Sequence, residues 1–280
     1  MRYLSLFFGV IFFSLSLTSC QTTKKTKKNF DAYLPHVFED YFSDYVPLKE
    51  VETIDDSVWD VSNVDISYVD KNRKLIAFTF DDSPSKTLEN ILAAFTSFNE
   101  SNPDCRATAT VFYNGSLIDE ASLHLLHTSY ILGFELGNHT HSHFDLTTLS
   151  ESELTAEINQ TDEILSQVDG KKRHLLRAPF GRVNEDIKTK VNVPLIDWTI
   201  DTLDWTGASA DDVYNRVWKG RFSGAIVLMH DGYPHTVDAL KRLLPDLKAD
   251  GYQVVSVSAM AKAHGCTLKN GKVYIRARKQ

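Results

Sequence analysis

The sequence predicts an α/β protein built on a parallel β-sheet. Short apolar runs without helical periodicity alternate along the chain with longer segments whose apolar residues recur every three or four positions. This alternation is typical of strand–helix–strand units, whose strands run parallel in one sheet. The length of 280 residues, 42% of them apolar, suits one large domain or two small ones. Seven predicted strands could close such a sheet into a barrel.

Each predicted strand is a short apolar run bounded by turn or polar residues. The strands are residues 75–80, 110–113, 134–138, 175–178, 195–200, 225–229 and 253–257. The helix predicted after the first strand has one apolar stripe, formed by Leu88, Ile91, Leu92, Phe95 and Phe98. A second helix is predicted at 123–130, and Ser150 with Glu153 forms the capping box that begins a third.

Asn270-Gly271 predicts a small hairpin at the carboxyl-terminal end of the sequence. This dipeptide supplies the positive φ angles of a tight turn, and residues 266–269 and 272–275 would be the two strands. The main domain is expected to span residues 73–280, including this hairpin.

The amino terminus is predicted to be an export signal, residues 1–19. Its apolar run is shorter than the roughly 20 residues that a membrane-spanning helix needs. The run ends in Leu17-Thr18-Ser19-Cys20, which resembles the lipobox of bacterial lipoproteins, so Cys20 is expected to carry a lipid that anchors the protein to a membrane of the cell envelope. An ordinary secretory signal with a chance cysteine is the alternative, and it also predicts export.

Two segments of opposite charge follow the signal. Residues 20–29 form a basic linker with four lysines, and residues 30–72 form an acidic, aromatic N-terminal extension of unassigned role. The whole chain carries 30 basic and 37 acidic residues, a net charge of −7. Nucleic acid is therefore not an expected partner, because the chain as a whole would repel a polyphosphate.

Polar residues gather directly after the predicted strands, where parallel α/β folds carry their working groups. His139 and His143 are four apart, which on a helical turn would present both imidazoles to one point. A carboxylate from another strand would complete a three-ligand metal site, although His141 could replace either histidine. Three cysteines in 280 residues exclude a four-cysteine zinc site, so a metal would be held by histidine and carboxylate.

Five short motifs in this region resemble, in order, those of the polysaccharide deacetylases of carbohydrate esterase family four, which share the chitooligosaccharide deacetylase homology domain. The motifs are Thr79-Phe80-Asp81-Asp82, His139-Thr140-His141-Ser142-His143, Arg177-Ala178-Pro179-Phe180-Gly181, Asp201-Thr202-Leu203-Asp204-Trp205 and Leu228-Met229-His230. The resemblance covers about residues 73–262, and it implies a distorted seven-stranded (β/α) barrel.

The resemblance implies a ligand set and a base. Asp82, His139 and His143 would hold one divalent metal ion, with Zn²⁺ as the first choice and Co²⁺ or Ni²⁺ as the ions of some members. Asp81 would be the general base for a metal-bound water, and Arg177 would pair with Asp81. The substrate would be an acetylated extracytoplasmic polysaccharide, with N-acetyl or O-acetyl groups as the target.

The same resemblance implies an acid and a binding pocket. His230 would be the general acid, and Asp204 would hold and polarise its ring. The backbone N–H of Phe180 would face the developing oxyanion, while Trp205 and Leu228 would line the pocket for the acetyl methyl group.

The chain departs from the family pattern in two places. Ser83 stands where the family usually has glycine, so this position must avoid positive φ or tolerate strain. Ala178 and Phe180 stand where proline and tyrosine are frequent, which removes a hydroxyl and leaves the backbone N–H.

Two other functions remain open at the level of the sequence. An Asp/His/His triad also describes a non-haem iron oxygenase, and the aromatic residues could serve a glycan-binding surface lipoprotein. The base Asp81 and the acid His230 favour hydrolysis over both. Cys105 and Cys266 could form a disulfide or remain buried thiols.

Overall fold

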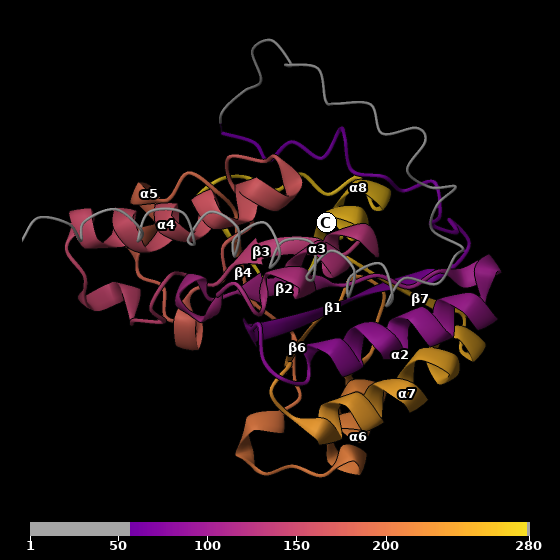
Figure 1. The fold of residues 1–280 in the computed structure, drawn as a ribbon. Helices are drawn as coiled ribbons and strands as arrows, with labels where there is room; N and C mark the ends of the chain where they lie inside the picture. The colour runs from indigo at the N-terminus through magenta and orange to yellow at the C-terminus, as the bar shows by residue number, and fades with distance from the viewer. Residues whose placement is uncertain (1–56, 279–280) are drawn as a thin grey trace, which may run out of the picture. The chain divides into compact units, whose positions relative to one another are not determined.

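The centre of the protein is a parallel sheet in which β1 (Lys74–Ser83) is the middle strand (Figure 1). The computed structural model describes residues 57–278. Within them, six strands pair in parallel in the order β3-β2-β1-β6-β5, with β7 pairing the start of β1. Their bounds are β2 Thr110–Tyr113, β3 Glu135–Asn138, β5 Ile200–Asp201, β6 Ile226–His230 and β7 Tyr252–Val255.

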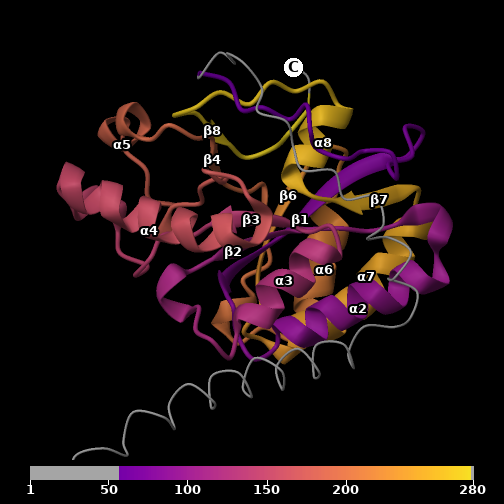
Figure 2. The same ribbon diagram turned by 45° about the horizontal axis from the view of Figure 1, so that its top comes forward.

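The described helices cover the sheet and follow the predicted alternation. They are α2 (Leu88–Ser101), α3 (Leu123–Ile131), α4 (Glu151–Asp169), α5 (Glu185–Lys190), α6 (Ala210–Gly220), α7 (Pro234–Ala249) and α8 (Val257–Ala263). The predicted apolar stripe of α2 is confirmed, because all five of its residues are buried. The capping box of Ser150 and Glu153 is also confirmed at the start of α4. Helices α2 and α7 lie side by side, and α4 packs on β3 (Figures 1 and 2).

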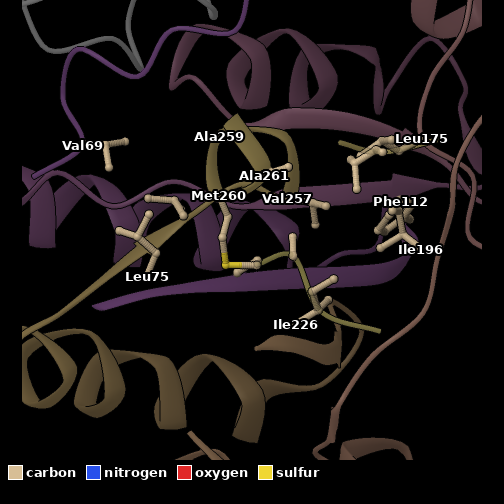
Figure 3. Close-up of a cluster of buried hydrophobic side chains, with 14 residues drawn as sticks. Val69, Leu75, Phe112, Leu175, Ile196, Ile226, Val257, Ala259, Met260 and Ala261 are labelled. Atoms are coloured by element: carbon tan, nitrogen blue, oxygen red, sulfur yellow. The ribbon is translucent and has the colours of Figure 1, made fainter. Parts of the chain in front are cut away.

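One face of the sheet carries a shared hydrophobic core. Leu75, Phe112, Ile196 and Ile226 come from four different strands, yet they meet in one cluster with Met260 of α8 (Figure 3). Leu75, Phe112 and Ile226 lie on the same face of the sheet, because Ala77 pairs with Ile226 and Thr79 pairs with Thr110. Helix α8 packs over this face.

The predicted strand at 175–178 is wrong as a regular element. Only Leu176 bridges β3 at Asn138 and β4 (Leu195–Ile196) at Leu195. Pro179 has no N–H and begins the 3₁₀ turn Pro179–Gly181, so the pairing ends after one position. This single bridge is the link between the main sheet and β4.

The predicted strand at 195–200 is divided into β4 and β5. Asp197 N–H donates to the Tyr274 carbonyl, whereas Thr199 N–H donates to the Ile226 carbonyl. The chain thus changes partner within three residues, from β8 (Val273–Tyr274) to β6. The break explains why one apolar run forms two short strands.

The predicted carboxyl-terminal hairpin is also wrong. The turn forms, with Gly271 at φ 68° and Lys272 N–H bonded to the Lys269 carbonyl. Its two flanks pair elsewhere, because Lys269 bridges Val58 and β8 runs parallel to β4. The Asn-Gly pair determines the turn locally, whereas the pairing partners come from the rest of the domain.

Several sequence predictions lie outside the described residues. They concern the signal at 1–19, the lipidated Cys20, the basic linker at 20–29 and the extension as far as residue 56. The described part of the extension packs on the domain, where Trp59 and Tyr68 contact the core. No described helix has the length and apolar character needed to cross a bilayer. Cys105 and Cys266 are both free thiols.

Candidate active site and metal centre

Two adjacent strands deliver the candidate acid and base to one place. β1 and β6 are paired in parallel with Asp81 beside His230 and Thr79 beside Leu228. Residues two apart on a strand share a face, so Leu228 and His230 lie on one side of β6. Leu228 is buried within the fold. This register places the predicted acid, His230, next to strand β1, which carries the predicted base Asp81 and the predicted metal ligand Asp82.

The three predicted metal ligands converge. Nε2 of His139 is 3.5 Å and Nε2 of His143 is 3.3 Å from Oδ1 of Asp82. One ligand atom of each residue lies within 4.8 Å of the other two. Oδ1 of Asp82 is buried and has no hydrogen-bond partner among residues 57–278, a condition that is costly for a carboxylate unless a cation faces it. This donor set of one carboxylate oxygen and two imidazoles therefore fits a divalent transition-metal ion.

The two histidines meet through a loop rather than through the helical turn that their spacing suggested. His139 follows β3 directly, and the backbone then takes positive φ at Thr140 (67°) and at His143 (58°). The left-handed turns fold the loop back so that both Nε2 atoms face Asp82. His141 turns away, with its Nδ1 beside Gly115 and Thr161.

Hydrogen bonds and charge prepare the ligands. Nδ1 of His139 is 2.7 Å from the Arg177 carbonyl oxygen, which fixes the ring and leaves Nε2 facing Asp82. Burial raises the pKa of Asp82, but the neighbouring His139 and His143 outweigh burial and hold that pKa below its ordinary value. Burial and the nearby His139 lower the pKa of His143, which favours the neutral imidazole that a metal binds.

The predicted base is buried near the end of β1. Asp81 is 4% exposed, and its Oδ1 accepts a hydrogen bond of 2.7 Å from Nη1 of Arg177. Arg177 is itself 1% exposed, and it also donates to Thr79 Oγ1 and to the Ile196 carbonyl. The other oxygen of Asp81 lies 3.7 Å from Nε2 of His139, on the side of the metal ligands.

The predicted acid is bound to its predicted partner. Nδ1 of His230 is 2.7 Å from Oδ1 of Asp204, and the His230 backbone N–H donates to Oδ2 of the same carboxylate. Thr236 Oγ1 also donates to Oδ2, at 2.8 Å. Burial lowers the pKa of His230, but the hydrogen bond to Asp204 and the carboxylate charges outweigh it and raise that pKa to about 9. The ring is therefore protonated at neutral pH, as a proton donor must be.

The rim of the site carries exposed aromatic side chains. Phe180 is 61% exposed and its ring lies 4.7 Å from that of His143. Phe180 also has positive φ, at 61°. Trp205 is 55% exposed beside Asp204. At the departure from the family pattern, Ser83 avoids positive φ, which falls instead on Asp82 (61°).

Several residues that fix this geometry escaped the sequence analysis. Thr79 anchors Arg177, Thr236 anchors Asp204, and Glu157 of α4 accepts hydrogen bonds from the backbone of the histidine loop. Glu157 had one usable signal, because it lies three residues after Leu154 on the buried side of a helix. Thr79 belongs to the first motif but received no role there, and Thr236 had no signal, since an uncharged hydroxyl within a helix looks ordinary.

Comparison with known proteins identifies the family. The sequence profile described as polysaccharide deacetylase matches residues 68–193. Peptidoglycan-N-acetylmuramic acid deacetylase PdaC of Bacillus subtilis is 32% identical over 195 residues, which cover 69% of this chain and 40% of PdaC. A peptidoglycan-N-acetylglucosamine deacetylase of Bacillus cereus is 31% identical over 231 residues, covering 76% of this chain and 97% of that protein.

A solved structure extends the likeness to the fold. The Xyl-CE4 domain of a multidomain xylanase from the hindgut metagenome of Trinervitermes trinervoides matches with a TM-score of 0.68 and 27% identity. The match covers 75% of this chain and 100% of that domain. The match thus extends to the architecture of nearly the whole described domain. This chain belongs to the polysaccharide deacetylase family, carbohydrate esterase family four.

Proposed function

We propose that this protein is a metal-dependent hydrolase that removes acetyl groups from an extracytoplasmic polysaccharide, with the N-acetyl groups of peptidoglycan as its first substrate. The observation that carries the proposal is the convergence of Asp82, His139 and His143 on one point, with Asp81 and His230 on paired strands beside it. The named activities of the relatives supply the substrate class.

The base side of the reaction uses the buried Asp81. Arg177 holds one oxygen of this carboxylate, so the other oxygen keeps a fixed direction toward the ligand cluster and can take the proton of an attacking water. A divalent cation bound by the three ligands would supply a water activated for attack and would polarise the acetyl carbonyl. Arg177 is fixed in turn by Thr79 and two backbone carbonyls, which leaves Asp81 little freedom.

The acid side uses His230. An amide nitrogen leaves poorly unless it gains a proton as the carbon–nitrogen bond breaks. Nδ1 of His230 is held by Asp204, which leaves Nε2 to donate that proton, and the raised pKa keeps the ring charged at neutral pH. The exposed Phe180 and Trp205 are suited to contact the sugar and acetyl groups.

This arrangement favours hydrolysis over the two alternatives. An iron oxygenase with an Asp/His/His triad needs no carboxylate fixed by a buried arginine beside its ligands, and no paired acid opposite them. A surface protein that only binds glycan has no use for either. Asp81 and His230 therefore mark the difference, and an oxygen requirement or the absence of turnover would indicate one of these alternatives.

The test is an acetate-release assay on the full chain. The assay compares peptidoglycan, chitooligosaccharides and acetylxylan, each with added Zn²⁺, Co²⁺ or Ni²⁺ and with EDTA. We expect release from peptidoglycan that EDTA abolishes and that Asp81→Asn reduces strongly, since the base is lost. Metal-independent release, or equal rates for Asp81→Asn and the wild type, would contradict the proposed mechanism.

Export and anchoring are part of the same proposal. The lipobox-like Leu17-Thr18-Ser19-Cys20 supports an exported lipoprotein attached to a membrane of the cell envelope. Metabolic labelling with a radioactive fatty acid tests it in a bacterial host. Wild type should incorporate label and fractionate with membranes, whereas Cys20→Ser should do neither. Label that persists in Cys20→Ser would contradict lipidation at this cysteine.

A further inference from the structure

The loop between the two histidine ligands is held from outside by one side chain. Oε2 of Glu157 accepts a hydrogen bond from the N–H of His141 at 3.0 Å and from the N–H of Ser142 at 2.7 Å. These two residues lie between His139 and His143 in the chain. Two successive N–H groups pointing at one carboxylate oxygen form a small anion-binding nest in the backbone.

This contact compensates two unfavourable features at once. The loop has positive φ at Thr140 and His143, a conformation that residues with a Cβ adopt at a cost. Glu157 is only 8% exposed, so its charge is costly unless polar groups face it. Within residues 57–278, its side chain accepts hydrogen bonds from the loop N–H groups alone. The carboxylate and the strained loop thus stabilise each other.

The helix that carries Glu157 does not depend on it. Helix α4 has its own capping box and buries Leu154 and Leu165 independently of the loop. A second tie joins the same helix to the base of the loop, because Asn138 donates to the Ile158 carbonyl and accepts from the Thr140 N–H. Helix α4 is therefore placed by its cap and its buried face, and it reaches the loop through polar side chains.

We propose that Glu157 is a positioning residue of the metal centre, which sets the spacing and direction of His139 and His143 by clamping the backbone between them. The inference rests on the proposed function, since it assumes that these histidines bind a metal. It adds a residue that touches neither the metal ligands' side chains nor the substrate. Loss of the clamp should therefore weaken metal binding before it disturbs the fold.

The experiment measures Zn²⁺ affinity of metal-stripped full-length protein by competition with a chromophoric chelator. Glu157→Ala should bind Zn²⁺ about 10- to 100-fold more weakly, the range seen when partners behind metal ligands are removed. Glu157→Gln keeps an acceptor oxygen at the same reach and should lie between Glu157→Ala and wild type. Glu157→Asp keeps the charge, but its side chain is one methylene shorter and its carboxylate no longer reaches the loop N–H groups. This variant should therefore bind Zn²⁺ more weakly than Glu157→Gln.

Two control variants on the same helix separate positioning from stability. Glu163→Ala removes an exposed glutamate of α4 and should leave Zn²⁺ affinity within about twofold. Leu165→Ala opens a cavity at a fully buried position of α4 and should lower the melting temperature of the stripped protein while leaving Zn²⁺ affinity within about twofold. If Glu157→Ala does not fold, the Zn²⁺ affinities of the other two variants test the proposal. Glu157→Asp should then bind Zn²⁺ more weakly than Glu157→Gln.

The outcomes separate the positioning role of Glu157 from the proposed metal centre. Wild-type affinity in Glu157→Ala, or in Glu157→Asp, would overturn the positioning role, and so would an equal loss in Leu165→Ala. Acetate release that requires metal would still support the proposed function in those cases. Absence of Zn²⁺ binding by the wild type would overturn both the inference and the proposed metal centre.

Discussion

The metal side and the acid side of the site differ in how their backbone is built. On the metal side, Asp82 and His143 both have positive φ, at 61° and 58°. On the acid side, His230 ends the regular strand β6, and positive φ falls on Leu203, next to Asp204. The difference shows that strain lies on the ligands themselves where several must converge on one point. A proton donor needs only a strand end and a carboxylate beside it.

The two sides also differ in what holds them. The metal side depends on groups from distant segments, namely Arg177 in the interior and Glu157 on α4. The acid side depends on one carboxylate, Asp204, which Thr236 of α7 anchors. We therefore expect substitutions on the metal side to affect metal binding and activity together. Substitutions on the acid side should affect activity and its pH dependence while metal binding is retained.

The largest expected effect follows from removing a metal ligand. Asp82→Ala should lower kcat/KM for acetate release by at least about 10⁴-fold, since a catalytic metal contributes several kcal/mol to the barrier. Zn²⁺ affinity should fall with it. His124→Ala, which changes an exposed histidine of α3, is the control and should leave both values unchanged. Retained activity in Asp82→Ala without Zn²⁺ binding would remove the metal side from the mechanism.

Loss of the acid should discriminate between substrates. His230→Ala should reduce hydrolysis of an N-acetyl substrate by about 10²- to 10⁴-fold, and it should reduce hydrolysis of an acetyl ester less, because an alkoxide leaves more easily than an amine. Zn²⁺ affinity should stay close to wild type, in contrast to Asp82→Ala. Equal losses on amide and ester would count against the acid role.

A smaller effect is expected when the carboxylate behind the acid is neutralised. The hydrogen bond that His230 donates to Asp204 is the main influence that raises the pKa of His230, so Asp204→Asn should lower that pKa. The protonated acid would then be lost at a lower pH, and the alkaline limb of the kcat/KM profile should move toward neutrality. At pH 8 we expect a loss of about tenfold or more. A profile that keeps its alkaline limb would show that another group limits the reaction.

The smallest effect concerns stability behind the metal side. Nδ1 of His174 bonds Asp162 and Nε2 bonds Asp169, and Asp162 also receives a hydrogen bond from Asn138 at the base of the histidine loop. Burial lowers the pKa of His174, but the two carboxylates outweigh it and raise the pKa above 6.5. The stabilisation by protonated His174 is therefore complete below pH 6.5 and is lost as pH rises through the folded-state pKa.

Urea unfolding of wild type and His174→Gln at two pH values measures this contribution. The wild type should exceed the variant by about 2 kcal/mol near pH 6, and by less near pH 9.5. Titration of Asp169 does not contribute to the difference between these two pH values. Burial raises its pKa, but His174 outweighs burial and holds that pKa below its ordinary value, so it stays ionised across this range. A difference that grows with pH would contradict the assigned charge state.

The sequence was informative about local elements with a periodic pattern or a capping signal. The apolar stripe of α2 and the capping box of α4 both formed where their residues indicated. It was less informative where the pairing partner decides the structure. Residues 175–178 contributed one bridge, and residues 195–200 formed two strands because the chain changes partner at Trp198. Such changes depend on distant segments, so no local pattern reveals them.

Within the site, residue type and spacing indicated which side chains could work together, because chemistry restricts metal ligands, bases and acids to a few residue types. The sequence alone therefore determined the α/β class, the family resemblance and the candidate set around Asp82 and His230. The tertiary structure decided how the loop between the histidines turns, which side chains clamp it, and that Asp81 lies beside His230. These features arise from contacts between segments far apart in the chain. Such contacts stabilise the structure only after folding has brought the segments together, so no local sequence pattern encodes them.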